Sequence, residues 1–396
     1  MKRILFTAAA IFSILYGNGQ APLDSSGFKS RKLKLDEINL VSSYYTQDGN
    51  NASVTGGIGS QKLTDIANVI DVKLTRYDKK LRKNNFGIEM GVDHYTSASS
   101  DKVDLSANSS ASHADTRFYP TLSWSRENEQ KGTTIGGALS SSTEYDYQSF
   151  GGNVSFSKKS NNKNGEFTAK FQTYLDQLKI ILPVELRTYG NATQRNYPMS
   201  ARNTYAASLS YSQIINERLQ VMVLADAIQQ NGYLSLPFHR VYFSDGSVHQ
   251  ENLPSSRIKI PLGLRANYFA GDRFIVKAYY RFYTDNWGII AHTLDLEAPV
   301  KVTSFFSISP FYRFYSQTAS NYFAAYKVHT ESALYHTSNY DQSAFYSNFF
   351  GAGLRFAPPK GLFGNQHFSN LEVRYGHYVK NINFNANIIS MNLTFK

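Results

Sequence analysis

The sequence contains no cysteine among its 396 residues, and this absence removes several functions at once. Disulfide bonds, thiolate metal sites, cysteine nucleophiles and a lipid anchor on an N-terminal cysteine are all excluded. No apolar run reaches the roughly 20 residues that a membrane-spanning helix needs. The chain therefore performs no thiol chemistry, and its exported form crosses no membrane as a helix.

Aromatic residues are abundant instead. The sequence has 28 Tyr, 27 Phe and 2 Trp, which make 14% of the chain, although only 18% of its residues are charged and its mean hydropathy is −0.38. Disordered chains are poor in aromatic residues, and no glycine or heptad repeat indicates collagen or a coiled coil. The formal charge of +11 permits a nucleic-acid partner without arguing for one.

The first 19 residues have the pattern of an export signal. Lys2 and Arg3 precede an apolar run from Ile4 to Leu15, and small residues from Gly17 to Gly19 follow. This pattern predicts a signal peptide over 1–19, cleaved near Gln20, since the apolar run is too short for an anchor helix. We expect a periplasmic N-terminal segment over 20–36 and one domain over 37–396.

That domain alternates apolar and polar residues with a period of two. Between 85 and 97, Phe86 and Ile88 fall on one face, whereas Glu89 and Asp93 fall on the other. Such alternation over 9 to 12 positions predicts a two-sided strand. Sixteen segments have this pattern: 37–47, 67–78, 84–97, 116–126, 133–142, 147–158, 166–177, 203–214, 218–229, 257–269, 273–284, 289–298, 304–316, 343–357, 368–380 and 385–395.

The connectors between these segments fall into two classes. Every second connector is short, as at 215–217 and 270–272, whereas most of the others are long: 48–66, 98–115, 178–202, 230–256 and 317–342. This layout is typical of a bacterial outer-membrane barrel, with short periplasmic turns and long extracellular loops. The sequence thus predicts an all-β, transmembrane, antiparallel up-and-down β-barrel of about 16 strands, with 14 to 18 as the range, in the cell outer membrane.

The polar faces of the strands form the predicted lumen. A barrel of about sixteen strands is wide enough for an aqueous channel, so the charges lead to two interpretations: a weakly anion-selective pore, or an ion-pair network that fills the interior. Asp176 and the following residues are expected to line the lumen: Glu89, Asp93, Arg117, Lys170, Asp226, Lys259, Arg265, Lys277, Arg281, Asp295, Glu297, Arg313, Arg355, Glu372 and Arg374.

Aromatic residues on the opposite faces predict contact with lipid. Rings gather at the two membrane interfaces of such barrels, and this explains them better than base stacking or sugar binding does. The predicted aromatic girdle comprises Phe118, Trp124, Phe150, Phe156, Tyr205, Tyr211, Tyr268, Phe356 and Phe395.

Several sequence blocks resemble one uncharacterised exported family. These blocks include Ser43–Asn51, Val54–Gly59, Tyr95–Asp101, Asp115–Arg117, Glu144–Tyr147, Asp285–Ile289, Pro310–Thr318 and Thr337–Asp341. They are similar to domain of unknown function 3570 of Bacteroidota and some Proteobacteria, from about residue 40 to the C-terminus. The resemblance implies an outer-membrane barrel, often encoded near a small lipoprotein, a thioredoxin-like protein and a flavin transferase. It therefore implies a periplasmic lipoprotein or redox protein as partner, and it transfers no catalytic residues.

Basic residues gather in the predicted periplasmic turns. They are Lys79, Lys80, Arg82, Lys83, Lys158, Lys159 and Lys163, with Arg31, Lys32 and Lys34 in the leading segment. Solvated turns explain them, and the alternative is an electrostatic docking site for an acidic periplasmic partner. A nucleic-acid partner is not expected, because export removes the usual target.

Motifs for metal binding or catalysis are weak. Asp48-Gly49-Asn50-Asn51 offers oxygen ligands for Ca²⁺ but lacks the spacing of a dedicated site, so a tight turn is the preferred interpretation. The nine histidines show no metal-ligand spacing, and His94 and His292 are only weak candidates for a hydrolase. We expect no metal, no cofactor and no catalytic residue. The predicted function is a platform or conduit for periplasmic partners, with a porin as the alternative and an outer-membrane hydrolase as a minor one.

Overall fold

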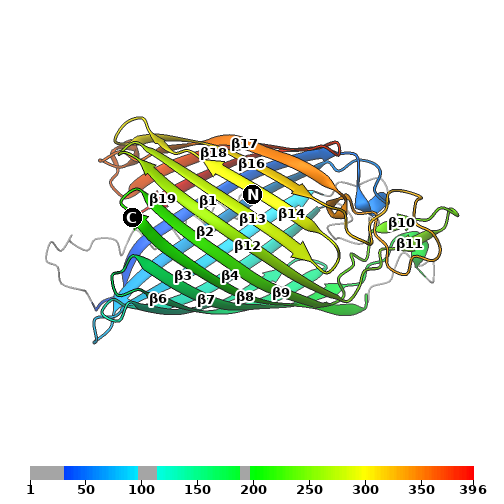
Figure 1. The fold of residues 1–396 in the computed structure, drawn as a ribbon, viewed down its shortest axis with the longest axis horizontal. Helices are drawn as coiled ribbons and strands as arrows, with labels where there is room; N and C mark the ends of the chain where they lie inside the picture. Colours follow the sequence, from blue (N-terminus) through cyan, green and yellow to red (C-terminus); the bar gives the residue numbers. More distant parts are fainter. Residues whose placement is uncertain (1–30, 97–113, 188–196) are drawn as a thin grey trace.

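Sixteen long strands form one closed antiparallel barrel in the computed structural model, which describes residues 31–96, 114–187 and 197–396 (Figure 1). This confirms the predicted fold class and strand number. The long strands are β1 (Lys34–Gly49), β2 (Leu63–Tyr77), β3 (Lys83–Thr96), β4 (Ala114–Asn128), β5 (Thr133–Thr143), β6 (Tyr147–Lys159), β7 (Gly165–Lys179), β8 (Met199–Asn216), β9 (Leu219–Gly232), β12 (Ser256–Ala270), β13 (Phe274–Asp285), β14 (Ile290–Glu297), β16 (Phe306–Gln317), β17 (Phe345–Phe356), β18 (Phe368–Lys380) and β19 (Phe384–Phe395).

The remaining elements are short. A two-residue strand, β15 (Val300–Lys301), precedes β16, and a small hairpin, β10 (Arg240–Tyr242) with β11 (Val248–Gln250), lies between β9 and β12. Single turns of 3-10 helix are η1 (Ser53–Thr55), η2 (Val184–Leu186), η3 (Tyr340–Gln342) and η4 (Leu362–Gly364). Within the described ranges, no helix is long and apolar enough to cross a bilayer.

The barrel closes by pairing its first strand with its last. β1 pairs antiparallel with β19 from Ile38 opposite Phe395 to Gly49 opposite Phe384, and β1 also pairs with β2. Closure gives every long strand a paired neighbour on both sides, so the sheet has no open edge. This matters because an unpaired backbone N–H or C=O in hydrocarbon costs several kcal/mol.

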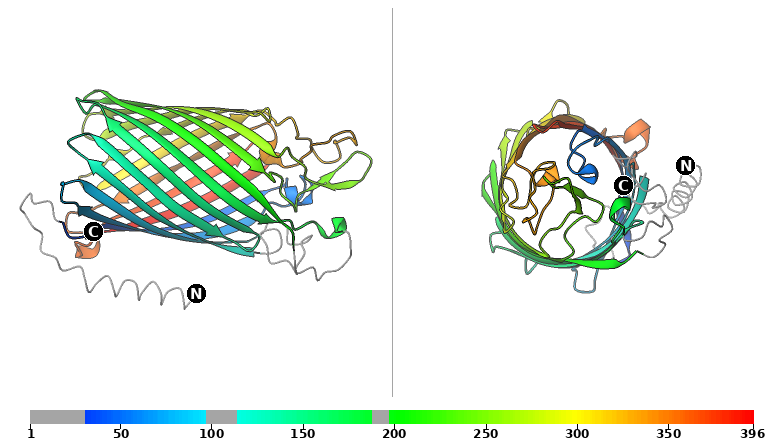
Figure 2. Two further views of the ribbon diagram at one scale, coloured as in Figure 1. Left: turned by 90° about the horizontal axis from the view of Figure 1, so that it is seen from below. Right: turned by 90° about the vertical axis from the view of Figure 1, so that its right-hand side faces the viewer.

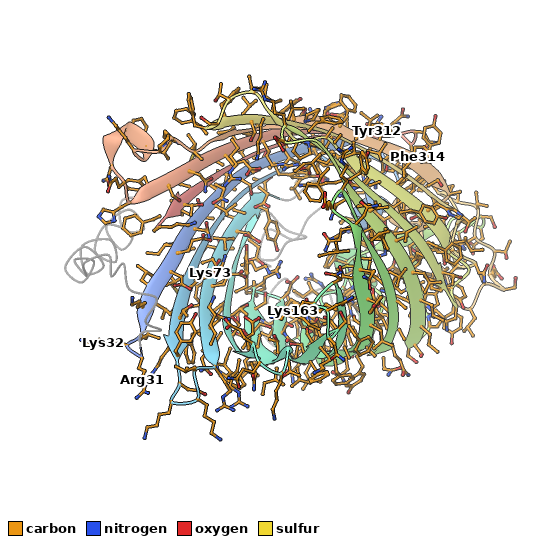
Figure 3. The ribbon with its side chains drawn as sticks, turned by 60° about the vertical axis from the view of Figure 1, so that its left-hand side comes forward. Arg31, Lys32, Lys73, Lys163, Tyr312 and Phe314 are labelled. Atoms are coloured by element: carbon orange, nitrogen blue, oxygen red, sulfur yellow. The ribbon has the colours of Figure 1, made fainter. Side chains whose placement is uncertain are left out.

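The strand register separates an outer face from an inner face. Leu139 of β5 lies opposite Leu122 and Gly152 on the neighbouring strands, and it is 72% exposed. Figure 3 shows Tyr312 and Phe314 projecting from the outside of the wall, whereas Lys73 projects into the interior. An apolar outer belt around a polar interior is the arrangement that a lipid bilayer requires.

The two ends of the barrel differ in their connectors. At the turn end, β8 and β9 are joined by 217–218, and β12 and β13 by 271–273; at the loop end lie the long segments 50–62, 233–255 and 318–344. β1 starts and β19 finishes at the turn end, opposite the long loops (Figure 1). The division into short connectors at the turn end and long ones at the loop end has exceptions. At the turn end, 357–367 is long; at the loop end, three connectors are short: 144–146, 286–289 and 381–383.

Some boundaries differ from those expected. β1 begins at Lys34, inside the expected 20–36 segment, because Lys34 and Leu35 extend the pairing with β2 beyond a bulge before Glu37. The expected signal peptide at 1–19 lies outside the described residues, as does most of the expected loop at 98–115. The hairpin β10–β11 and the short β15 were not predicted, since neither has an alternating run long enough to be recognised.

Candidate functional site

The lumen contains many charged side chains, and most of the predicted site residues are among them. Strand register places all fifteen residues of the predicted lumen set, together with Asp176, on the inner face. The set has seven acids and nine bases when Asp176 is included. The inward positions follow directly from the period of two, because residues paired across antiparallel strands point to the same side.

One part of this set forms an ion-pair ladder across the β13–β18 wall, made of one separate pair and one chain of linked pairs. Arg313 of β16 lies 2.5 Å from Asp295 of β14, and Lys277 of β13 lies 3.1 Å from Glu297. Arg374 of β18 contacts both Glu297 and Glu372 at 3.3 Å. These side chains are partly exposed to the lumen, so the ladder restrains the wall but contributes little net stability.

A second cluster lies on β3 and β4. Arg117 lies 4.0 Å from Asp93 and 3.8 Å from Glu144, and the Tyr119 hydroxyl donates to Asp93 at 2.6 Å. The Tyr95 hydroxyl also donates to Glu144. The structure therefore links the predicted lumen residues Asp93 and Arg117 with tyrosines that sequence reasoning did not select.

Other lumen charges have no opposite charge beside them. Among the residues that the structure describes, no carboxylate lies within ion-pair distance of Lys259, Arg265 or Arg281. Arg265 instead places its guanidinium over the Tyr279 ring, 5.3 Å from the ring centroid. Lys170, Arg355, Glu89 and Asp226 likewise have no ion pair within the described ranges.

The lumen charges are unequally distributed around the ring. On their inner faces, β12 and β13 carry five bases and one acid, whereas β2 and β3 carry four acids and two bases. Around the barrel, β12 lies eight strands after β2, and β13 lies eight strands after β3. Because the ring has sixteen long strands, these two pairs face each other across the lumen. The residues are Arg257, Lys259, Arg265, Lys277, Arg281 and Asp285 on the first wall, and Asp65, Asp71, Glu89, Asp93, Lys73 and Lys83 on the second.

A cavity of about 490 Å³ adjoins the basic wall. Arg281 and Arg313 line it together with the aromatic rings of Tyr279, Tyr315 and Phe349. A smaller cavity of about 150 Å³ shares Arg313 and Phe349 with it and reaches the ion-pair ladder. The two cavities adjoin along the inside of the β13–β18 wall. Their lining combines cationic and aromatic groups with the carboxylates Asp341, Asp295 and Glu297.

Three loops pack against one another at the loop end and form what we call the loop cap: 50–62, 233–255 and 318–344. The right-hand view of Figure 2 shows the cap lying over the mouth, within the outline of the wall. Val241 and Thr337 have no exposed surface. Short bridges join Phe243 to His329 and Asn252 to His336, so residues distant in sequence hold the cap together.

A buried carboxylate stabilises the centre of the cap. Glu251 is 3% exposed and accepts hydrogen bonds from the Leu236 N–H at 2.7 Å and the Thr337 hydroxyl at 2.5 Å, with the His239 ring 3.4 Å away. Burial alone would raise the pKa of Glu251, but His239 and the hydrogen-bond donors together hold it below its ordinary value. The carboxylate form therefore favours the closed arrangement of these loops.

Charged groups attach the cap to the wall and also join its loops to one another and to η2. Asp341 of η3 pairs with Lys380 of β18 at 2.6 Å. Arg240 of β10 donates to the Val54 carbonyl at 2.7 Å and pairs with Glu185 of η2. The cap is therefore anchored to the barrel through β18.

The nine predicted girdle residues all lie on the outer face by register. Phe118, Phe150 and Tyr205 lie toward the loop end of their strands. Trp124, Phe156, Tyr211, Tyr268, Phe356 and Phe395 lie toward the turn end. The outer face thus has aromatic rings near both ends, and their contact with the lipid interface remains a prediction.

The histidines do not form a catalytic arrangement in the described part of the chain. His94 contacts the Thr116 hydroxyl at 2.9 Å, and His292 contacts the Tyr280 hydroxyl at 2.7 Å, both on the outer face. In the cap, Ser247 contacts His249, but the Asp245 carboxylate accepts from the serine and does not orient the histidine. In a serine hydrolase the carboxylate must accept a hydrogen bond from the histidine ring and so orient it toward the serine.

Three histidines, His249 among them, surround Phe243 in the cap, an arrangement that sequence spacing did not indicate. The His249, His329 and His336 rings lie 4.3, 5.7 and 4.9 Å from the Phe243 ring. Both ring nitrogens of His336 contact carbonyl oxygens, of Ala333 and Gln250. Burial lowers the pKa of His329. These rings pack the cap and have no free nitrogen pair aimed at a common point.

An acidic cluster at the loop end was also missed. Asp115, Glu144 and Asp146 each place an oxygen within 4.8 Å of the others. Burial, then Asp115 and Glu144, raise the pKa of Asp146 to about 6, and burial raises that of Glu144. At Asp48, where a tight turn was preferred to calcium binding, the carboxylate accepts from the Gly49 N–H and lies 4.0 Å from Lys62.

The fold and the charged lumen define a sixteen-stranded β-barrel of the outer-membrane type. The chain belongs to the family of proteins of unknown function DUF3570, whose model matches residues 94–358. This confirms the resemblance in the sequence blocks. Comparison with curated proteins gives no match.

Solved structures of other barrels are similar at a low level. A BenF-like porin from Pseudomonas fluorescens Pf-5 is 10% identical, with a TM-score of 0.43, covering 93% of this chain and all of the porin. OccK2 (OpdF) of Pseudomonas aeruginosa is 8% identical, with a TM-score of 0.42, covering 93% and 99% of the two chains. The siderophore receptor PirA from Acinetobacter baumannii is 11% identical, with a TM-score of 0.45, covering 87% and 53%. The fold assignment rests on the strand pairing of the chain itself.

Proposed function

We propose that the protein is a solute channel of the outer membrane with a weak preference for anions. In this proposal the loop end faces the outside of the cell and the turn end faces the periplasm, as in other barrels of this type. Solutes enter beside the loop cap and pass along the cationic and aromatic wall.

The observation that carries the proposal is the pair of unpaired arginines on the basic wall. Arg265 and Arg281 have no carboxylate partner among the described residues, and the opposite wall is acidic. Opposed walls of different sign produce a field across the lumen, which orients water and separates anions from cations. The unpaired guanidinium groups add a positive potential beside the 490 Å³ cavity that Arg281 lines.

The proposal is tested by ion selectivity in a planar bilayer. A salt gradient across the purified barrel should give a reversal potential on the anion-selective side, and the double variant Arg265→Glu with Arg281→Glu should move it toward cations. Lys80→Glu, in an exposed turn between β2 and β3, is the matched control and should leave selectivity unchanged. Absence of conductance, or equal selectivity in all three proteins, would overturn the proposal.

A second candidate is the platform for periplasmic partners, and the basic turn end favours it. Arg31, Lys32 and Lys163 lie at this rim in Figure 3, and Lys79 and Lys80 are exposed in the β2–β3 turn. Exposed basic groups accelerate association with an acidic protein in a salt-dependent manner. A periplasmic lipoprotein or redox protein is the partner that the family resemblance implies, and it would supply any thiol chemistry, since this chain has no cysteine.

Capture experiments distinguish the platform from the channel. The barrel with Lys79, Lys80 and Lys163 changed to Gln should lose a co-purifying periplasmic protein, while its conductance stays unchanged. Retention of the same partner by this variant would contradict the docking role of the turns.

A further inference from the structure

Three carboxylates meet at the loop end, where β4 begins and where β5 turns into β6. Asp115 is the second residue of β4, and Glu144 and Asp146 belong to the 144–146 turn. One oxygen from each residue lies within 4.8 Å of the other two. Asp115 and Asp146 are 7% and 8% exposed, so two of the three acids are buried.

The Asp146 carboxylate has no partner in another residue. Asp115 accepts from the Thr116 and Tyr145 N–H groups, and Glu144 accepts from the Tyr95 hydroxyl. Across the described ranges, no side chain or backbone group of a different residue hydrogen-bonds to the Asp146 carboxylate, and none forms an ion pair with it. Its own backbone N–H is the donor, and Lys179 acts on it only from beyond ion-pair distance. A buried carboxylate with so little compensation is costly, and such groups are normally paired or coordinate a metal.

Neighbouring cations do not neutralise the cluster. Arg117 lies 3.8 Å from Glu144 but also serves Asp93, at 4.0 Å. Lys179 donates to the Tyr145 carbonyl at 2.6 Å and lies over the Tyr145 ring, 4.1 Å from its centroid. Four carboxylates, counting Asp93, therefore share two cations, Arg117 and Lys179.

We propose that Asp115, Glu144 and Asp146 bind a divalent cation, Ca²⁺, at the loop end of the barrel. Calcium takes oxygen ligands at 2.3–2.6 Å, so two oxygens bound to one ion are at most about 5.2 Å apart. The 4.8 Å limit on the three carboxylate oxygens satisfies this condition. Water supplies the remaining ligands, since calcium accepts six to eight in flexible geometry.

The position of this site connects the wall with the loop cap. A cavity of about 240 Å³ beside it is lined by Glu144 and Asp146 and, from the cap, by Leu236, Pro237 and Phe238. A bound cation would hold the start of β4 against the 144–146 turn and so fix the wall on which this part of the cap rests. Calcium therefore stabilises the loop end, where an extracellular ion is available.

Terbium luminescence tests the site directly in the purified full-length barrel, free of lipopolysaccharide. Tb³⁺ replaces Ca²⁺ and is excited through nearby tyrosines, and Tyr95 and Tyr145 adjoin the cluster. We expect a Tb³⁺ emission that Ca²⁺ displaces, and at least a tenfold loss of Ca²⁺ affinity in Asp146→Asn and in Asp115→Asn. Asp245→Asn, in the exposed hairpin turn between β10 and β11, is the matched control and should retain wild-type affinity.

Thermal unfolding separates metal binding from a folding defect. In EDTA, Asp146→Asn should be at least as stable as the wild type, because it removes an uncompensated charge. Calcium should raise the melting temperature of the wild type and of Asp245→Asn, but not of Asp146→Asn. A wild type without Ca²⁺-displaceable emission, or an Asp146→Asn variant with unchanged Ca²⁺ affinity, would overturn the proposal.

Discussion

The Tyr119 ring lies directly over Gly91, its cross-strand partner on the inner face, and its hydroxyl donates to Asp93 at 2.6 Å. The missing side chain at Gly91 leaves the space that the ring fills. Tyr119 also lies beside Arg117, whose guanidinium is 4.7 Å from the ring centroid. This glycine–tyrosine pair therefore positions the charged cluster on β3 and β4.

The variant Gly91→Ala should displace Tyr119, because a Cβ at this position would overlap the ring. We expect destabilisation of about 1–3 kcal/mol, typical of overpacking, measured by unfolding in detergent. Gly152→Ala is the control, since its Cβ would meet Leu139 at an ordinary 3.6 Å on the outer face. Equal stability of the two variants would show that the ring moves away without cost.

The variant Asp341→Asn should loosen the attachment of the loop cap to β18. It removes the charge that pairs with Lys380, a side chain only 10% exposed. Single-channel recordings should show more frequent transitions between conductance levels than in the wild type. Asp48→Asn is the control, because its 4.0 Å contact with Lys62 joins two exposed side chains and should have no effect. A recording like that of the wild type would contradict a restraining role for Asp341.

Acid should open the loop cap through Glu251. Its pKa is lowered in the folded protein from the ordinary 4.5, so its stabilising effect is present above that pH and is lost as the pH falls through the folded-state value. The protection factors of amides in 233–255, which correct for the slower intrinsic exchange in acid, should therefore fall in the wild type as the pH drops below 4.5. Glu251→Gln should show fast exchange already at pH 7, because loss of the charge weakens buried hydrogen bonds by about 1–3 kcal/mol.

The control for this measurement is Glu331→Gln, an exposed residue of the same cap. It should exchange like the wild type at every pH. If Glu251→Gln also exchanged like the wild type at pH 7, the cap would be held by packing around Val241 and Thr337 alone.

The ion pair between Arg313 and Asp295 should affect the ion selectivity of the channel more than the stability of the barrel. Their side chains are 51% and 25% exposed, and solvent-exposed pairs of this kind are worth at most about 1 kcal/mol. Asp295→Asn should shift the unfolding midpoint little but make the reversal potential more anion-selective, since it leaves Arg313 unpaired in the lumen. A large loss of stability without a change in selectivity would show that the pair is structural and does not influence the ions.

Sequence reasoning succeeded for the wall because successive side chains of a strand face opposite sides of the sheet, so residue polarity alternates with a period of two. Glu89 and Ile88 are neighbours in the chain, but Glu89 occupies a polar position of the alternating pattern and Ile88 an apolar one. The register places them on opposite faces of β3. Closure into sixteen strands also followed from the sequence, since a hydrophobic outer face without a helix must be satisfied by a closed sheet.

The cap was beyond sequence reasoning because its contacts join segments far apart in the chain. Phe243 meets His329, and Arg240 meets Val54, without any repeating pattern. Periodicity reports which side of an element is buried, but it carries no information about which loop a given loop will contact.

The sequence by itself thus indicated about sixteen strands, within a range of 14 to 18, and determined the inner and outer faces and the absence of thiol chemistry. Only the tertiary structure decided which charges pair, as in the ladder through Glu297, and which remain single, as at Arg281. It also brought Asp115 to Asp146, which are separated by two strands' length of chain. The physical reason is that alternation fixes the direction of each side chain, whereas the distance between two charges depends on register and ring closure.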